Sequence, residues 1–144
     1  FIASWGENGL EPAQRDWVAK SLNAYADLKK NGPAVLQAEA SYHEALVLFL
    51  DGSHSASNEE IFWLIDNLPG QGEWRFKALL ILAHNYAALD DVFQANYTLD
   101  FIIAENFIAE TVQEAKAFQV QLNTPAVDAT APSEETIIET PTLP

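Results

Sequence analysis

The sequence contains no cysteine and no methionine, not even at its first position. The absence of cysteine excludes disulfides, thiolate metal sites and a cysteine nucleophile, and it leaves the cellular compartment open. Because no methionine begins the chain, we expect it to be an excised or processed piece of a longer protein. Glycine and proline are also scarce, at 6 and 7 of the 144 residues. This composition favours helices over sheets.

Positive charge is scarce as well. The chain has 7 lysines and arginines against 21 acids, so its formal net charge is -14. No lysine or arginine lies between Lys30 and Arg75, and Lys116 is the only one after Lys77. Such a surface repels phosphate backbones and anionic lipid, so we expect no nucleic-acid partner. No apolar run reaches the ~18 residues of a membrane helix, so we expect no membrane insertion.

Hydrophobic residues are abundant, at 49% of the chain, and many recur at helical spacing. The clearest stretch covers residues 74–106. Its first half places apolar residues three and four apart, namely Phe76, Leu79, Leu80, Leu82, Ala83 and Tyr86. After Asp90 and Asp91, an aspartate pair suited to capping the next helix, the period resumes with Phe93, Ala95, Tyr97, Leu99, Ile102 and Ile103. This pattern predicts two antiparallel helices that bury their stripes on each other.

The preceding stretch repeats this pattern at a constant offset in residue number. Ala45, Gly52, Ser53, Ser57, Ile61, Leu64 and Pro69 hold the places of Ala83, Asp90, Asp91, Ala95, Leu99, Ile102 and Phe107. We call the step from Ala45 to Ala83, which is the same for every pair, the repeat offset. Small residues at the places of Ala83 and Ala95 suit the point where two helices of a hairpin approach most closely.

The hairpin resembles a tetratricopeptide repeat, a helix–turn–helix unit of about 34 residues. The places that carry the resemblance hold Leu79, Leu82, Ala83, Tyr86, Ala95 and Leu99. The main hairpin departs from the family at Asp90, where glycine is usual, at Ile102, where a small residue is usual, and at Phe107, where proline is usual. The earlier unit has the family's residues at Gly52 and Pro69, and an insertion at its glycine-rich break makes the repeat offset longer than the family's unit.

The resemblance implies an all-α, helical-hairpin solenoid of about six helices over residues 1–122. Its repeats lie near 38–71 and 76–109, and a capping helix over 108–122 covers the last stripe. Earlier helices are expected over 12–30, 34–50 and 55–67, the last with Ser57 and Glu60 spaced as a capping box. Residues 123–144 contain four prolines, five threonines and four acids but no base and no aromatic residue. This composition predicts a flexible acidic tail.

Candidate catalytic and metal sites are weak. Glu39 and His43 stand four apart on one predicted helix, but a helical metal site needs further ligands from other helices. His54 lies between two serines in a turn without the glycine arrangement of an oxyanion hole. No glycine-rich phosphate loop is present. We therefore expect no enzyme activity, no metal and no cofactor.

Partner binding is the function that the resemblance implies. In this family the first helix of each repeat lines a concave groove that takes peptide, and the groove places hold Tyr42, His43, Leu46, Phe49, Lys77, Leu80, Ile81 and His84. We expect a protein partner in this largely apolar groove. Other arrangements stay open: the flanking helices or the rest of a longer solenoid cover the groove, or the tail of a second copy fills it and the chain self-associates. The alternative class is a small-molecule or carbohydrate module that uses the aromatic side chains Tyr42, Phe49, Trp63 and Trp74.

Overall fold

The computed structural model describes residues 11–125, which form helices joined by short turns and contain no strand. The helices are α1 (Pro12–Asn31), α2 (Ala34–Leu50), α3 (His54–Asn67), α4 (Gly72–Ala88), α5 (Val92–Glu105) and α6 (Ala109–Asn123). The predicted all-α hairpin architecture is confirmed. Residues 1–10 and nearly all of the predicted tail at 123–144 lie outside the described part. Within the described part, no helix combines the length and the apolar character needed to cross a bilayer.

The helices begin and end where the local sequence favours it. Pro12 occupies the first turn of α1, where its missing N–H is not needed, and the Gln14 side chain accepts a hydrogen bond from the Glu11 N–H at 2.7 Å. Lys29 and Lys30 stand in the last turn of α1, at the negative end of its dipole. Asp91 caps α5 as predicted, because its Oδ1 accepts a hydrogen bond from the Gln94 N–H at 3.1 Å.

The two hairpins repeat with the predicted offset. Each bound of α4 and α5 lies one repeat offset after the corresponding bound of α2 and α3. The turns repeat as well, because Gly52 and Asp90 both have a positive φ, of 83° and 63°. In each turn this residue donates to the carbonyl three residues earlier, and the next residue, Ser53 or Asp91, donates to the carbonyl five residues earlier at 2.8 Å. Asp90 thus adopts the left-handed conformation that glycine adopts in the first hairpin.

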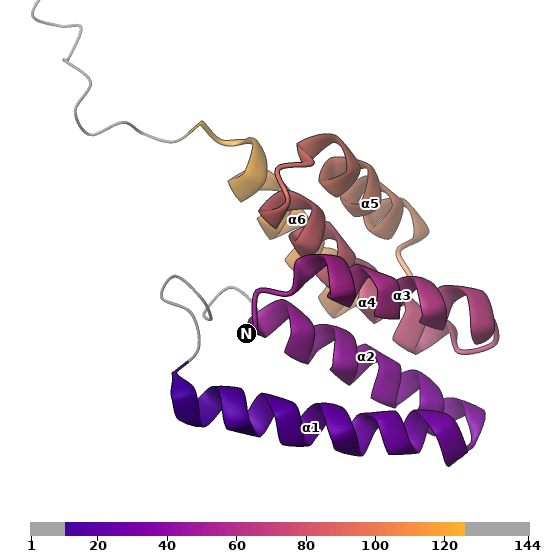
Figure 1. Ribbon diagram of the computed structural model, residues 1–144. Coiled ribbons are helices and arrows are strands. Elements are labelled where there is room, and N and C mark those ends of the chain that lie inside the picture. The colour runs from indigo at the N-terminus through magenta and orange to yellow at the C-terminus, as the bar shows by residue number, and fades with distance from the viewer. Residues whose placement is uncertain (1–10, 126–144) are drawn as a thin grey trace, which may run out of the picture.

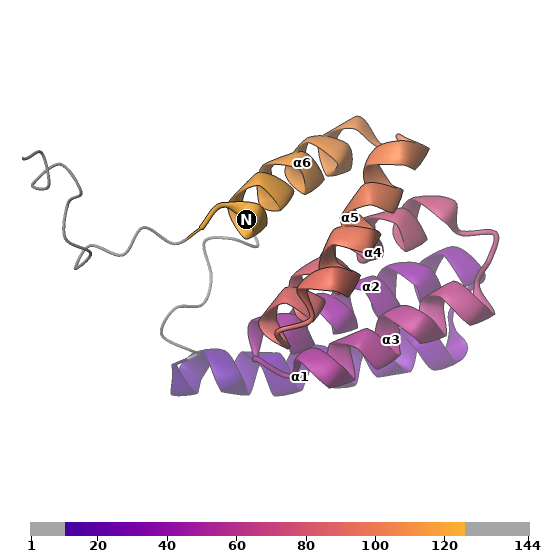
Figure 2. The same cartoon turned by 90° about the horizontal axis from the view of Figure 1, so that it is seen from above.

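The helices form two layers. The inner layer contains α2, α4 and α6, in which α4 packs between the other two. The outer helices α1, α3 and α5 make their main contacts with inner helices. Helix α1 packs on α2, α3 packs on α2 and α4, and α5 packs on α4 and α6. Figure 1 shows this stack running from α1 to α5, and Figure 2 shows α6 inclined to α1 and α2.

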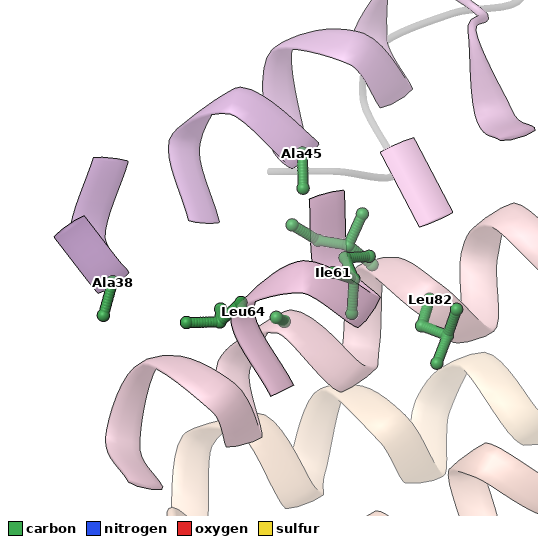
Figure 3. Packing of buried hydrophobic residues seen from close by; sticks show 7 residues of the cluster. Ala38, Ala45, Ile61, Leu64 and Leu82 are labelled. Atoms are coloured by element: carbon green, nitrogen blue, oxygen red, sulfur yellow. The ribbon is translucent and has the colours of Figure 1, made fainter. Parts of the chain in front are cut away.

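Two core clusters hold the layers together, and α4 contributes to both. The first cluster joins α2, α3 and α4 through the buried residues Ala38, Ala45, Ile61, Leu64, Ala78, Ile81 and Leu82. Figure 3 shows Ile61 between Ala45 and Leu82, with Leu64 and Ala38 further along the same seam. The second cluster joins α4, α5 and α6 through Phe76, Leu80, Ala83, Leu99, Ile102, Val112 and Ala115. The half-buried Leu79 packs against both clusters.

Some predicted contacts are wrong. Phe93 and Tyr97, assigned to the buried stripe of α5, are 74% and 66% exposed, because Ala95, Leu99 and Ile102 form the buried face instead. The capping box of Ser57 and Glu60 is also wrong. Helix α3 begins at His54, and the Ser57 hydroxyl donates to the Ala45 carbonyl at 2.7 Å, so it joins the hairpin rather than capping the helix.

Candidate binding surface

The inner layer carries all eight residues predicted to line the groove, but it does not present them equally. Leu80 and Ile81 are buried, at 5% and 0% exposure, and belong to the two core clusters. They pack α4 against its neighbours, and in this conformation their side chains are not accessible to a partner. The other six are half-buried at the surface of the inner helices, namely Tyr42, His43, Leu46, Phe49, Lys77 and His84.

A group of four rings joins α1, α2 and the start of α4. The His43 ring stacks on Tyr25 with centroids 5.5 Å apart and meets the edge of Tyr42 at 5.2 Å. Trp74 lies 5.4 Å from the Tyr42 ring and 6.0 Å from that of His43. The Lys77 ammonium lies 4.8 Å from the centre of the Trp74 ring, so it makes a cation–π contact there. We call Tyr25, Tyr42, His43, Trp74 and Lys77 the inner ring cluster.

Charged groups surround the inner ring cluster. Glu73 accepts a hydrogen bond from Lys77 at 3.1 Å, and a Glu39 oxygen lies 4.0 Å from Nε2 of His43. Burial lowers the pKa of His43; Glu39 opposes this shift and Lys77 adds to it. Burial, helped by the Glu114 carboxylate, raises the pKa of Tyr42. The cluster therefore favours a neutral imidazole and a neutral phenol at neutral pH.

A second group of rings lies further along the inner layer, where α6 covers it. His84 stacks on Phe118 of α6 with centroids 3.7 Å apart, and it also meets the edge of Phe49 at 5.8 Å. Burial lowers the pKa of His84 to about 4. This half of the predicted groove is thus partly filled by the capping helix.

Beneath the inner layer, a buried polar chain links the two hairpins. Asn85 donates to the Ser57 hydroxyl at 2.8 Å, and its carbonyl oxygen lies 2.8 Å from Nδ1 of His54. Ser57 in turn donates to the Ala45 carbonyl. His54, the first residue of α3, therefore belongs to a structural link, and its serine neighbours do not contribute to this polar chain.

An ion cluster that no sequence pattern predicted joins α1, α2 and α3. Lys29 lies 2.5 Å from a Glu60 oxygen and 3.5 Å from one of Glu44, and its ammonium is 4.3 Å from the centre of the Trp63 ring. Glu44 is 6% exposed, and its other oxygen has no hydrogen-bond partner among the described residues. Burial, together with Glu60, raises the pKa of Glu44 to about 7. Lys29 and Glu60 are far apart in the sequence, so nothing signals this contact before the helices are placed.

The aromatic residues of the alternative class do not form a flat platform. Tyr42, Phe49 and Trp74 pack against the first core cluster, and the planes of Tyr42 and Trp74 meet at 47°. Trp63 lies beneath Lys29. Within residues 11–125, no three histidine, aspartate or glutamate side chains converge as a metal-binding group.

Comparison with protein-family models, with curated proteins and with solved structures finds no match for this chain.

Proposed function

We propose that the chain is a tetratricopeptide-like interaction module that binds a segment of a partner protein along its inner layer. The observation that supports this proposal is the inner ring cluster. Its rings come from three helices, and the side chains of Tyr42, His43 and Trp74 are half-buried, so part of each remains accessible to solvent. Aromatic side chains that also carry a hydrogen-bonding group contribute much of the binding energy in protein interfaces.

The chemistry of the cluster indicates the kind of segment. Neutral His43 and Tyr42 offer hydrogen bonds without charge, and the rings offer apolar area. Lys77 is 33% exposed and is already paired with Glu73, so the cluster does not offer a terminal carboxylate a set of free cations. The best fit is an apolar or aromatic side chain of an extended or helical segment.

Selection of random peptides on phage against the full chain tests this proposal. Selected peptides should bind the Lys77→Glu variant at least tenfold more weakly, because the substitution removes the cation from the Trp74 ring and adds repulsion at the cluster. Lys116→Glu, which makes the same charge change at an exposed position of α6, should alter affinity less than about twofold. Peptides that bind both variants equally well would place the binding surface elsewhere.

Self-association through residues 123–144 is a separate prediction, because those residues lie almost wholly outside the described part. Light scattering coupled to size exclusion compares the full chain with a chain that ends at Asn123. A monomer in both cases leaves the inner layer free for a partner. An oligomer that dissociates on truncation would replace the partner proposal with one of assembly.

A further inference from the structure

The outer face of α5 carries an aromatic stripe that no helix of the described part covers. Phe93, Tyr97 and Phe101 follow one another at spacings of four and are 74%, 66% and 48% exposed. Three such residues mark one line along a helix, about 12 Å long at about 1.5 Å per residue. The buried residues Ala95, Leu99 and Ile102 belong to the core-facing side of the same helix. We call Phe93, Tyr97 and Phe101 the α5 stripe.

The α5 stripe leads into a hollow at the end of the helix. This hollow has a volume of about 340 Å³, and Phe101 forms part of its wall. The rest of the lining is mainly apolar and comes from α3, α4 and the loop after α5, with Ile65, Phe76, Leu79 and Phe107 among its residues. Its charged groups are Arg75 and Glu105. A hollow of this size beside a line of exposed rings suits one large anchoring side chain of a bound helix.

The charges around the α5 stripe are acidic, apart from Arg75 in the wall of the hollow, whose guanidinium donates to the Pro69 carbonyl at 3.2 Å. Asp90 and Asp91 stand before it, Asp100 lies beside it, and Glu105 follows it, all of them exposed. No lysine or arginine occurs between Lys77 and Lys116. Two copies of this face would therefore bring like charges together, which opposes self-association. The charges instead complement a partner that carries lysine or arginine beside its apolar residues.

The first hairpin shows how a cation sits at the corresponding place. Phe101 stands one repeat offset after Trp63, and over the Trp63 ring lies Lys29 of the preceding outer helix, at 4.3 Å. Asn67 stands one repeat offset after Lys29, and its side chain donates instead to the carbonyl of Trp63 at 2.9 Å. In the second hairpin the ring of Phe101 borders the hollow, and the residue at the place of Lys29 is uncharged.

From these observations we infer that the α5 stripe and its hollow form a docking surface for a basic amphipathic helix of another protein. Apolar side chains of that helix, spaced by three and four, would lie on the stripe, and one would enter the hollow. Its lysines or arginines would face Asp90, Asp91, Asp100 and Glu105. The surface belongs to the outer layer, so this inference is independent of the binding proposed for the inner layer.

The test uses three synthetic peptides and the full chain in titration calorimetry. The first peptide is an amphipathic helix of leucine and lysine, the second has glutamate in place of lysine, and the third has the composition of the first with its leucines scattered around the helix. We expect the first to bind at least tenfold more tightly than either of the others. In addition, Phe93→Ser combined with Tyr97→Ser should weaken its binding at least tenfold.

Phe62 of α3, which is 42% exposed, provides the matched control. Phe62→Ser should leave binding of the first peptide within about twofold, and thermal melting of both variants followed by circular dichroism verifies that they fold. Equal binding of the first and third peptides would reduce the effect to net charge and overturn the inference. So would an equal loss in the Phe62 variant, or a dimer of the chain alone that the double variant dissociates.

Discussion

Replacing Glu44 with glutamine should stabilise the protein at a pH above 7 and leave its stability nearly unchanged below 4.5. Glu44 is 6% exposed, and one of its oxygens has no hydrogen-bond partner among the described residues. Burial and the neighbouring Glu60 raise its pKa from 4.5 to about 7, although Lys29 works in the opposite direction. Glutamine is neutral at every pH and has nearly the shape of the protonated carboxyl, so it removes this titration from the folded state.

The sign and the size follow from linkage. Because the folded protein holds the proton more tightly than the unfolded chain, the stabilisation by the proton is complete below 4.5 and is lost as the pH rises to about 7. The difference between the two pKa values corresponds to about 3 kcal/mol, at about 1.4 kcal/mol for each pKa unit. The unfolding free energy of Glu44→Gln should therefore exceed that of the wild type by about 3 kcal/mol above pH 7.

Urea unfolding followed by tryptophan fluorescence, at a series of pH values across this range, measures the difference. His84 titrates too, since its pKa is lowered from 6.5 to about 4, so its protonation destabilises the fold as the pH falls through that window. Its effect is common to the variant and the wild type and cancels in the difference. Glu59→Gln, at an exposed position of α3, should change stability by less than about 0.5 kcal/mol. A variant less stable than the wild type above pH 7 would refute the reasoning, because it would mean that ionised Glu44 is stabilised by Lys29.

Two further pairs of substitutions test the repeated hairpin. Gly52→Ala should lower the free energy of unfolding by about 1 kcal/mol, because the φ of Gly52 is 83°, although an added methyl group meets no described atom within 4 Å. Gly70→Ala, whose methyl group is equally free of contacts, should cause no measurable change in the same urea unfolding. Ser57→Ala should cost about 2 kcal/mol by leaving the buried Asn85 amide without its acceptor. Adding Asn85→Val gives both positions the residues found one repeat offset away in the other hairpin. In a double-mutant cycle, this second substitution should recover most of the lost stability. An additive loss would show that the polar chain does not couple Ser57 and Asn85.

The helices were predictable because strong local signals coincide with the period of the apolar residues. Pro12 begins α1, the sequence from Asn31 to Pro33 ends it, and Asp91 caps α5. The observed bounds differ from the predicted ones by one residue at most in α1, α2, α3 and α6. The repeat offset was visible because Ala45, Ile61 and Leu64 recur as Ala83, Leu99 and Ile102. The structure shows why these places repeat, since all six side chains are at 0% exposure.

The distribution of side chains between core and surface was less predictable. Helix α5 has two apolar lines, and only packing decides that Ala95, Leu99 and Ile102 face the core while the α5 stripe faces outward. In α4, the unbroken apolar run from Leu79 to Leu82 has no polar residue to mark a face. Leu80 was therefore assigned both to the buried stripe and to the groove, and nothing local indicated that Ile81 lies inside.

The ion cluster was unpredictable for a different reason. Lys29, Glu44 and Glu60 belong to three helices, and each side chain by itself looks like part of a solvated helix face. Ser57 and Glu60 have the spacing of a capping box, and their contacts with other helices make that pattern irrelevant here. Such contacts depend on how helices cross, which local periodicity does not contain.

The position of α4 between the two core clusters has a consequence for how the chain unfolds. The two hairpins cannot separate without exposing one side of α4 to solvent. Leu79, which packs against both core clusters, would then lose part of its contacts. A chain of two such units would otherwise melt in two steps, as modular arrays do when their interfaces are weak. Shared burial of one helix instead couples the halves into a single cooperative unit. The amide protons of α4 should consequently be the last in the described part of the chain to exchange with solvent.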